Sequence, residues 1–343
     1  MKIAIDAQLT VGTATGIGEY VRGLCVALRE AGTEVAELRE PALDPWRFDR
    51  RLLWDQLLLP LAARKSHAEL LHCAAGTMPL LSGLPMVVTV HDVAWLKVQA
   101  HAPAYSRWYF GRFSLRRYRR ANHIVVDSHF SRSELLPMLD IEAHRVSVVY
   151  PGVSAEFFRI VRCPRASQTI LVVGTVERRK NLGVLIRALP AVPGATIVSI
   201  GPSTPYQHEC EELARLLGVR DRLQFRGYVS RIELLQWYAR CAVAAVPSEY
   251  EGFGYAAAQA LAAGVPLLVS DASSLPEIAG GDATMVAAES AEAWAAALQG
   301  ALTIGVPSPT QERASRERAA KRFGWAASAL NMRELFQTVL QHQ

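Results

Sequence analysis

The sequence predicts an α/β protein of two doubly wound, Rossmann-like domains, and three observations lead to that prediction. The chain has 343 residues, half of them hydrophobic, so each half is long enough to bury its own core. Short runs rich in β-branched residues alternate with helical patterns, which is typical of parallel sheets with crossover helices. The alternation stops once, at "YPGVSAEFFRIVRCPRASQ", where proline, glycine and basic residues indicate a linker, and then restarts.

The expected elements follow this alternation from one end of the chain to the other. In the first half we expect strands at Lys2–Asp6, near Glu34–Leu38, near Leu70–Cys73, and at Met86–Val90, Ile124–Asp127 and Val146–Tyr150, with helices that include Ile17–Ala31 and Ser131–Leu139. Ser131 and Glu134 have the spacing of a capping box. In the second half we expect strands at Ile170–Gly174, Ala195–Ile200, Leu223–Arg226, Val243–Val246, Leu267–Ser270 and Thr284–Val286, with helices at Asn181–Leu189, Gln207–Leu217 and Arg231–Arg240.

Composition excludes several classes of protein. No run of 18 or more uncharged apolar residues is present, so no membrane-spanning helix is expected. The apolar run of "MKIAIDAQLT" is too short for a signal peptide and predicts a buried strand. The five cysteines are scattered, odd in number and without CxxC spacing, which indicates neither a disulfide framework nor a zinc site. A cytoplasmic location is therefore expected.

The net charge of +5 is concentrated in the segment "SRWYFGRFSLRRYRR". Six arginines between Arg107 and Arg120 alternate there with five aromatic residues. Nucleic acid or an anionic membrane surface could bind such a segment. The alternative is an amphipathic helix whose basic face is simply solvated and whose aromatic residues belong to the core.

Glycines follow the first strand, at "TGIGEY". Gly16 and Gly18 allow a sharp turn and a close approach of the backbone to a ligand at the start of a helix. The third glycine of the dinucleotide fingerprint is missing, because Val21 and Arg22 stand where it should fall. This weakens a nicotinamide-binding interpretation, and a purely structural turn is the alternative.

The stretch "VVGTVERRKNLGVLI" places Arg178, Arg179 and Lys180 between a buried strand and a helix. Cations at the carboxyl end of a strand, beside a helix N-terminus, form a suitable clamp for a diphosphate. Cations near the positive pole of a helix are locally unfavourable, and a bound anion would relieve that cost. The alternative is a solvated loop.

The stretch "EYEGFGYAAAQALAAG" predicts a loop followed by a helix. Gly252 and Gly254 expose backbone amides that can hold an anion, and Glu251 can accept a hydrogen bond from a hydroxyl. Gln259 lies among alanines on the helix, which indicates burial, and a buried amide usually has a partner. The alternative makes Glu251 an exposed turn residue and Gln259 a surface position.

Two further strand ends have polar side chains. His91 and Asp92 follow an apolar strand in "VVTVHDVAWL", at the edge where open α/β sheets bind ligands. A structural histidine is the alternative. The loop "DASSLPEIAGG" brings hydroxyl groups to the end of another strand.

Taken in order, these segments resemble the retaining glycosyltransferases of family 4, which have the GT-B fold. The matching stretches are "TGIGEY", "HDVAWL", "VVDSHFSRSEL", "VVYPGV", "ERRKNLGVLIRAL", "GYVSRIELLQWYARC", "VPSEYEGFGYAAAQALAAGVPLLVSDASSLPEIAGG" and "RFGW", and they cover nearly the whole chain in the family's order. The resemblance implies an acceptor-binding domain at residues 1–160, completed by a C-terminal helix at 325–343, and a nucleotide-sugar-binding domain at 161–324 that faces it across a cleft.

The resemblance also implies roles for particular residues and no metal or other cofactor. Lys180 and Arg179 would hold the leaving diphosphate, because the arginine that many relatives have after the strand glycine is Thr175 here. Further implied contacts are donor binding by Glu251, by His91 and by the amides of Gly252, Phe253 and Gly254; nucleotide contact by Ser273, Ser274 and Leu275; and substrate contact by Gly16, Gly18 and Asp92. The family's second acid, which grips the ribose hydroxyls, is Gln259 here. An amide can accept one such hydrogen bond but has no charge, so weaker ribose binding is expected.

The function expected from this resemblance is retaining transfer of a hexose to a lipid-linked or oligosaccharide acceptor in the synthesis of a cell-surface glycan such as lipopolysaccharide. The pattern is most similar to bacterial mannosyltransferases that use GDP-mannose, with rhamnose, glucose and N-acetylhexosamine as rival sugars. A polyprenyl-diphosphate acceptor would place the Arg107–Arg120 segment on the inner face of the cytoplasmic membrane, and no nucleic acid partner is expected. The alternatives are a non-catalytic nucleotide-sugar-binding protein and a sugar-nucleotide-modifying or nicotinamide-dependent α/β enzyme.

Overall fold

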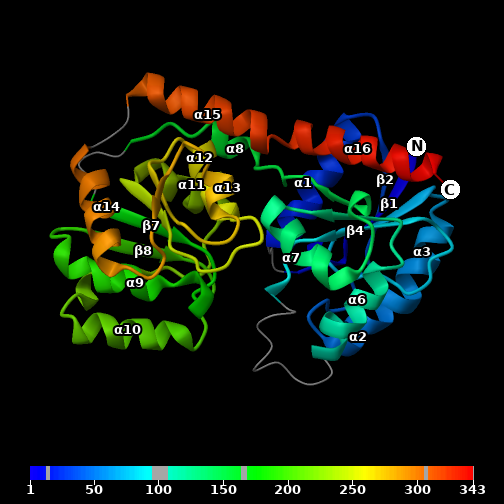
Figure 1. Cartoon of the computed structure of the whole chain (residues 1–343), viewed down its shortest axis with the longest axis horizontal. Helices are drawn as coiled ribbons and strands as arrows, with labels where there is room; N and C mark the ends of the chain where they lie inside the picture. Colours follow the sequence, from blue (N-terminus) through cyan, green and yellow to red (C-terminus); the bar gives the residue numbers. More distant parts are fainter. Residues whose placement is uncertain (13–15, 95–106, 164–167, 305–307, 343) are drawn as a thin grey trace. The chain divides into compact units, whose positions relative to one another are not determined.

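The computed structural model describes residues 1–12, 16–94, 107–163, 168–304 and 308–342. The chain forms two compact units: an N-terminal domain, Met1–Gly152 with Phe323–Gln343, and a C-terminal domain, Val153–Arg322 (Figure 1). The sequence placed the first boundary at residue 160 instead. The segment after Gly152 belongs to the C-terminal domain because Phe157 is fully buried there and packs edge-on against Tyr238, with ring centroids 5.4 Å apart.

Within the described residues, each domain contains one six-stranded sheet, and every strand pair in it is parallel. The N-terminal sheet has the order β2-β1-β3-β4-β5-β6, with β1 at Lys2–Asp6, β2 at Glu34–Leu38, β3 at Leu70–Cys73, β4 at Met86–Val90, β5 at His123–Val126 and β6 at Val146–Val148. The C-terminal sheet has the order β12-β11-β10-β7-β8-β9, with β7 at Thr169–Val173, β8 at Thr196–Ile200, β9 at Leu223–Phe225, β10 at Val243–Val246, β11 at Leu267–Ser270 and β12 at Thr284–Val286. The expected α/β class and doubly wound domains are confirmed.

Helices connect the strands in both domains. The helices of the N-terminal domain are α1 (Gly16–Glu30), α2 (Phe48–Leu53), α3 (Leu59–Lys65), α6 (Phe113–Tyr118), α7 (His129–Leu139) and α16 (Trp325–Gln341), with π-helical turns η2 (Trp54–Leu58) and η3 (Arg107–Arg112). Those of the C-terminal domain are α8 (Ala155–Phe158), α9 (Leu182–Ala188), α10 (Tyr206–Leu216), α11 (Arg231–Arg240), α12 (Tyr255–Ala262), α13 (Leu275–Ala279) and α14 (Ala291–Ile304); α15 (Pro309–Phe323) leads out of it. In the described part of the chain, none of these helices is both long enough and apolar enough to cross a membrane.

The last helix, α16, completes the N-terminal core. It lies alongside α1 in Figure 1, and Met332, Phe336 and Val339 pack into the same cluster as the residues of β1 and α1. Trp325 explains two glycines of this domain: a Cβ built at Gly23 or at Gly152 would lie 2.2 Å from its indole ring. A side chain at either position would push the tryptophan, and the helix with it, away from the sheet.

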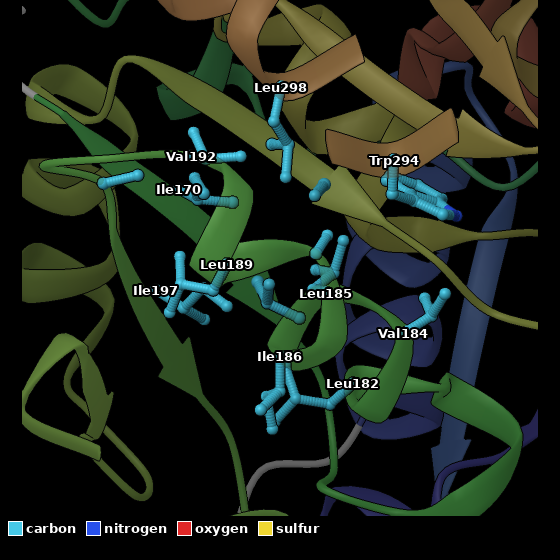
Figure 2. Close-up of a cluster of buried hydrophobic side chains, with 14 of the residues drawn as sticks. Ile170, Leu182, Val184, Leu185, Ile186, Leu189, Val192, Ile197, Trp294 and Leu298 are labelled. Atoms are coloured by element: carbon cyan, nitrogen blue, oxygen red, sulfur yellow. The ribbon is translucent and has the colours of Figure 1, made fainter. Parts of the chain in front are cut away.

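The C-terminal core lies between the sheet and helices α9, α10 and α14. Figure 2 shows its centre, where Leu185 of α9 and Leu189, which directly follows α9, face Ile170 and Ile197 of the sheet, with Trp294 of α14 fully buried nearby. The inner strands β7, β8, β10 and β11 are buried on both faces, as expected where helices cover a parallel sheet on each side, whereas the edge strands β9 and β12 are partly exposed. This rigid sheet positions the loops at its carboxyl edge.

The predicted capping box at Ser131 was wrong. The helix predicted from Ser131 begins at His129, and its cap is Ser128, whose side chain accepts a hydrogen bond from the Ser131 backbone N–H at 3.0 Å. Ser131 is therefore inside the helix and forms no capping box.

The basic segment is also not one amphipathic helix. Its backbone leaves helical geometry at Gly111 (φ −91°, ψ −107°), inside η3 and two residues before α6 begins. Arg117 is fully buried and donates hydrogen bonds to the carbonyls of Met78 and Tyr109 and to Ser114, with its guanidinium 4.2 Å from the Tyr109 ring. Arg116, Arg119 and Arg120 are exposed; the side chains of Arg107, Phe110 and Arg112 lie outside the described residues.

Candidate active site

A compact cluster of charges lies at the carboxyl edge of the C-terminal sheet. The Lys180 ammonium donates a hydrogen bond to Glu251 Oε1 at 2.5 Å, and a guanidinium nitrogen of Arg179 lies 3.6 Å from Glu251 Oε2. β7 and β10 are neighbours in the sheet, and these residues follow the two strands. Sheet order therefore brings together groups that are 71 residues apart in the chain.

The carboxylate of Glu251 is held from several sides. Glu251 is only 7% exposed, and Ser248 donates a hydrogen bond to its Oε1 at 2.8 Å. Burial alone would raise the pKa of this carboxyl, but the charges of Lys180 and Arg179 outweigh burial and lower the pKa below its ordinary value. Glu251 is therefore anionic at neutral pH. A small cavity beside the cluster is lined by residues that include Thr175, Lys180 and Ser248.

The three predicted cations do not form one group. Arg179 donates to the Tyr250 carbonyl at 3.0 Å and pairs with Glu177 at 2.8 Å, which holds it beside the Glu251 loop. Arg178 instead pairs with Glu209 of α10 at 2.6 Å on the exposed surface. Of the three, Arg179 and Lys180 lie at Glu251, and their role as a diphosphate clamp stays a prediction.

The loop that contains Glu251 is fixed by its neighbours. Gly254 caps α12 with φ of 91°, and a Cβ there would lie 2.7 Å from Leu275, which is fully buried. The Glu251 backbone N–H donates to Ser273 Oγ at 2.9 Å, and the buried hydroxyl of Ser274 donates to the Glu251 carbonyl at 3.0 Å. In this structure, then, Ser273, Ser274 and Leu275 support the Glu251 loop; their contact with a nucleotide stays a prediction.

The remaining predicted residues of this region lie in the same loop or on α12, which follows it. Gly252 and Phe253 are buried, and the Phe253 ring packs edge-on against Tyr255 with centroids 5.7 Å apart. Gln259 is half-buried on α12, and its Oε1 accepts a hydrogen bond from Tyr238 at 3.3 Å. Tyr238 is a buried partner of Gln259 that the sequence did not reveal.

His91 and Asp92 follow β4 in the N-terminal domain. His91 Nδ1 lies 2.6 Å from Asp127 Oδ2, and its Nε2 lies 3.0 Å from the Ala74 carbonyl. Burial disfavours the imidazolium, but the Asp127 carboxylate and these hydrogen bonds outweigh it, so the pKa of His91 is raised. Asp92 accepts a hydrogen bond from the Ala94 backbone at 3.1 Å.

Of the two glycines predicted near the substrate, Gly16 is exposed at the start of α1 and Gly18 is buried in it. Residues 13–15 before them lie outside the described residues.

Asp127 is a site residue that the sequence reasoning missed. The sequence predicts Asp127 as the last residue of a strand, whereas β5 ends at Val126 and Asp127 lies just beyond it. Its position after a strand end next to His91 is the signal that could have identified it.

Comparison with known families and structures follows the same division into two halves. Residues 14–157 match the model for Glycosyltransferase Family 4, and residues 167–303 match the model for Glycosyl transferases group 1.

Curated relatives include D-inositol 3-phosphate glycosyltransferases. That of Xylanimonas cellulosilytica is 29% identical over 276 residues, which cover 74% of this chain and 66% of the relative. That of Mycobacterium marinum is 29% identical over 222 residues, covering 60% of this chain and 47% of the relative. The chain thus matches about half to two thirds of the length of these relatives.

Solved structures of similar fold include sucrose-phosphate synthase from Thermosynechococcus elongatus, with a TM-score of 0.75 and 22% identity, covering 100% of both chains. HepE from Anabaena in complex with UDP and glucose has a TM-score of 0.74 and 17% identity, covering 98% of this chain and 100% of that one. The predicted GT-B fold is confirmed.

Proposed function

We propose that this protein transfers a sugar from a nucleotide-sugar to a hydroxyl group of an acceptor. The proposal rests on the order of the two matches along the chain, Glycosyltransferase Family 4 followed by Glycosyl transferases group 1. The anomeric configuration of the sugar is retained and no metal ion takes part. The observation that supports catalysis most directly is the Lys180–Glu251–Arg179 cluster, with Glu251 buried and both cations within 3.6 Å of it.

The cluster suits the chemistry of this transfer. The bond between the anomeric carbon and the diphosphate oxygen breaks, and its electron pair stays on the leaving oxygen. Lys180 and Arg179 stabilise the negative charge that develops there, and removing one such preorganised group typically costs about 3–4 kcal/mol. The acceptor oxygen then bonds to the anomeric carbon on the same face, and its proton passes to the leaving diphosphate.

The donor is proposed to be a hexose nucleotide, with GDP-mannose as the first candidate from the sequence pattern. UDP-sugars are the main rival, because UDP occupies the structurally similar HepE. The relatives named for inositol phosphate and the neighbour named for sucrose phosphate also make a phosphorylated polyol or sugar a candidate acceptor beside a lipid-linked glycan.

The acceptor side is proposed to lie in the N-terminal domain and to contact an anionic membrane surface. Trp108 is 55% exposed and stacks on Phe113, with ring centroids 4.6 Å apart, and Phe113 lines a surface hollow together with the exposed Arg116 and Arg120. An exposed indole next to cations suits the interface of an anionic bilayer. Co-sedimentation with phosphatidylglycerol vesicles should fall for Arg116→Glu/Arg120→Glu and stay unchanged for the exposed control Arg313→Glu.

A thermal-shift panel with GDP, UDP, dTDP and ADP, each with its hexose conjugates, tests the donor class. A ligand at about a hundred times its dissociation constant should add about 2.7 kcal/mol to the free energy of unfolding. A selective shift followed by product with the donor's anomeric configuration, measured by proton NMR, supports the proposal. No shift with any of these ligands would refute it.

The departure at Gln259 favours a second candidate, a protein that binds a nucleotide-sugar without transferring it. In that case one ligand of the panel would stabilise the protein, but neither sugar transfer nor slow hydrolysis of the donor would follow.

A further inference from the structure

His91 and Asp127 are neighbours because of the register of β4 and β5. Val90 pairs with Val126, so the residues that follow the two strands lie side by side. His91 Nδ1 lies 2.6 Å from Asp127 Oδ2, and the Asp127 side chain is only 6% exposed. Parallel pairing therefore forms this contact from the residues that directly follow two apolar strands.

The second ring nitrogen of His91 is also occupied. Nε2 lies 3.0 Å from the Ala74 carbonyl, which can only accept, so Nε2 has a proton. The Tyr20 and His91 rings pack edge-on, with centroids 4.9 Å apart and planes at 82°. The Tyr20 hydroxyl forms a hydrogen bond of 3.3 Å with the Thr89 hydroxyl. The imidazole is thus held on three sides, and both of its nitrogens are used within the N-terminal domain.

The charged and titratable groups around His91 favour its protonated form. Asp127 of the β5 end and Asp92 of its own loop both raise the pKa of His91. Tyr20 of α1 is neutral, because burial raises the pKa of its hydroxyl far above the ordinary range. His72 of β3 is neutral as well, because burial and the charge of His91 lower its pKa to about 3.

We propose that Asp127 is a positioning residue that keeps His91 as a fixed, doubly hydrogen-bonded imidazolium. His91 then offers an anionic substrate a fixed positive charge, and neither transfers a proton nor donates a ring hydrogen bond to that substrate. This use of the charge rests on the proposed glycosyl transfer. The protonation state and its dependence on Asp127 do not rest on it.

The first test is nitrogen-15 NMR of the imidazole groups, with the His91 signals assigned from a His91→Gln spectrum. The wild-type protein should show both His91 nitrogens protonated at pH 7 and above. Asp127→Asn should lower the His91 midpoint to about 6.5 or less, the ordinary value for histidine. Asp127→Glu should restore the raised midpoint, and the exposed control Glu142→Gln should leave it unchanged.

The second test is the pH profile of donor turnover. With the His91 midpoint near 6.5, turnover by Asp127→Asn should fall about 50-fold between pH 6.5 and 8.5, because about half of the molecules are protonated at the midpoint and about one in 100 two units above it. The wild-type and Asp127→Glu proteins should keep turnover over that range.

The outcomes separate the two proposals. A neutral His91 in the wild-type protein at pH 7, or an unchanged midpoint in a folded Asp127→Asn protein, would overturn the role of Asp127. The wild-type spectrum decides the first point even if the variant does not fold. A protonated His91 in a protein that turns over no nucleotide-sugar would leave Asp127 as its positioning residue and refute the transferase.

Discussion

Removing the ammonium of Lys180 should leave a buried carboxylate with an incomplete set of partners. In Lys180→Met, Glu251 stays 7% exposed and loses its 2.5 Å hydrogen bond, while Arg179 remains 3.6 Å away. Breaking a buried ion pair on one side typically costs about 3–5 kcal/mol. The remaining Arg179 and Ser248 compensate in part, so we expect a loss of about 3 kcal/mol in the free energy of unfolding of the C-terminal domain.

A second variant separates the charge effect from simple loss of packing. In Lys180→Met/Glu251→Gln the buried carboxylate is gone, so most of the loss should be recovered, with a coupling of about 1–3 kcal/mol between the two sites. Arg178→Met is the matched control, two residues before Lys180. Its pair with Glu209 is solvent-exposed, at 74% and 47%, and should contribute less than about 1 kcal/mol.

Calorimetry and urea unfolding measure these differences. For a domain of this size, about 3 kcal/mol corresponds to a fall of roughly 6–12 °C in Tm. Because the chain has two domains, the transition of the C-terminal domain must be followed separately, for example through Trp294 or Trp237 fluorescence. If Lys180→Met lost no more than Arg178→Met, or if Glu251→Gln brought no recovery, the cluster would not be a coupled buried ion pair.

Three further perturbations follow from the same geometry. Gln259→Glu should raise the affinity for the preferred nucleoside diphosphate about 2- to 30-fold, because a charge-assisted hydrogen bond is stronger than a neutral one by that factor. Equal or lower affinity in calorimetric titration would disprove a ribose contact. Folding lowers the pKa of Glu251, so the stability that its carboxylate contributes is present above about pH 4.3 and is lost as the pH falls through the lowered pKa. In urea unfolding, Glu251→Gln should therefore reduce the loss of unfolding free energy between about pH 5 and 2. Trp325→Ala should destabilise the N-terminal domain by about 3 kcal/mol, because the indole fills the space between Gly23 and Gly152, and an unchanged Tm would contradict that packing.

The local pattern of the chain was sufficient for the fold. Apolar runs such as Met86–Val90 and Leu267–Ser270 were recognisable as strands because a parallel sheet buries both faces of a strand, and their bounds agree with the structure. Signals that depend on one or two residues were less dependable. Ser131 is a residue type that commonly caps helices, but it lies within the first turn of α7, since the true cap is Ser128.

Positions at strand ends could be predicted, whereas their partners could not. The sequence by itself placed Lys180, Glu251 and His91 at the carboxyl ends of strands, because a strand end is a local property. Only the tertiary structure decided that Lys180 pairs with Glu251, that Arg178 turns away to Glu209, and that Asp127 holds His91. These pairings depend on which strands are neighbours in the sheet and on which charges burial forces together, and both are set by contacts between residues far apart in the chain.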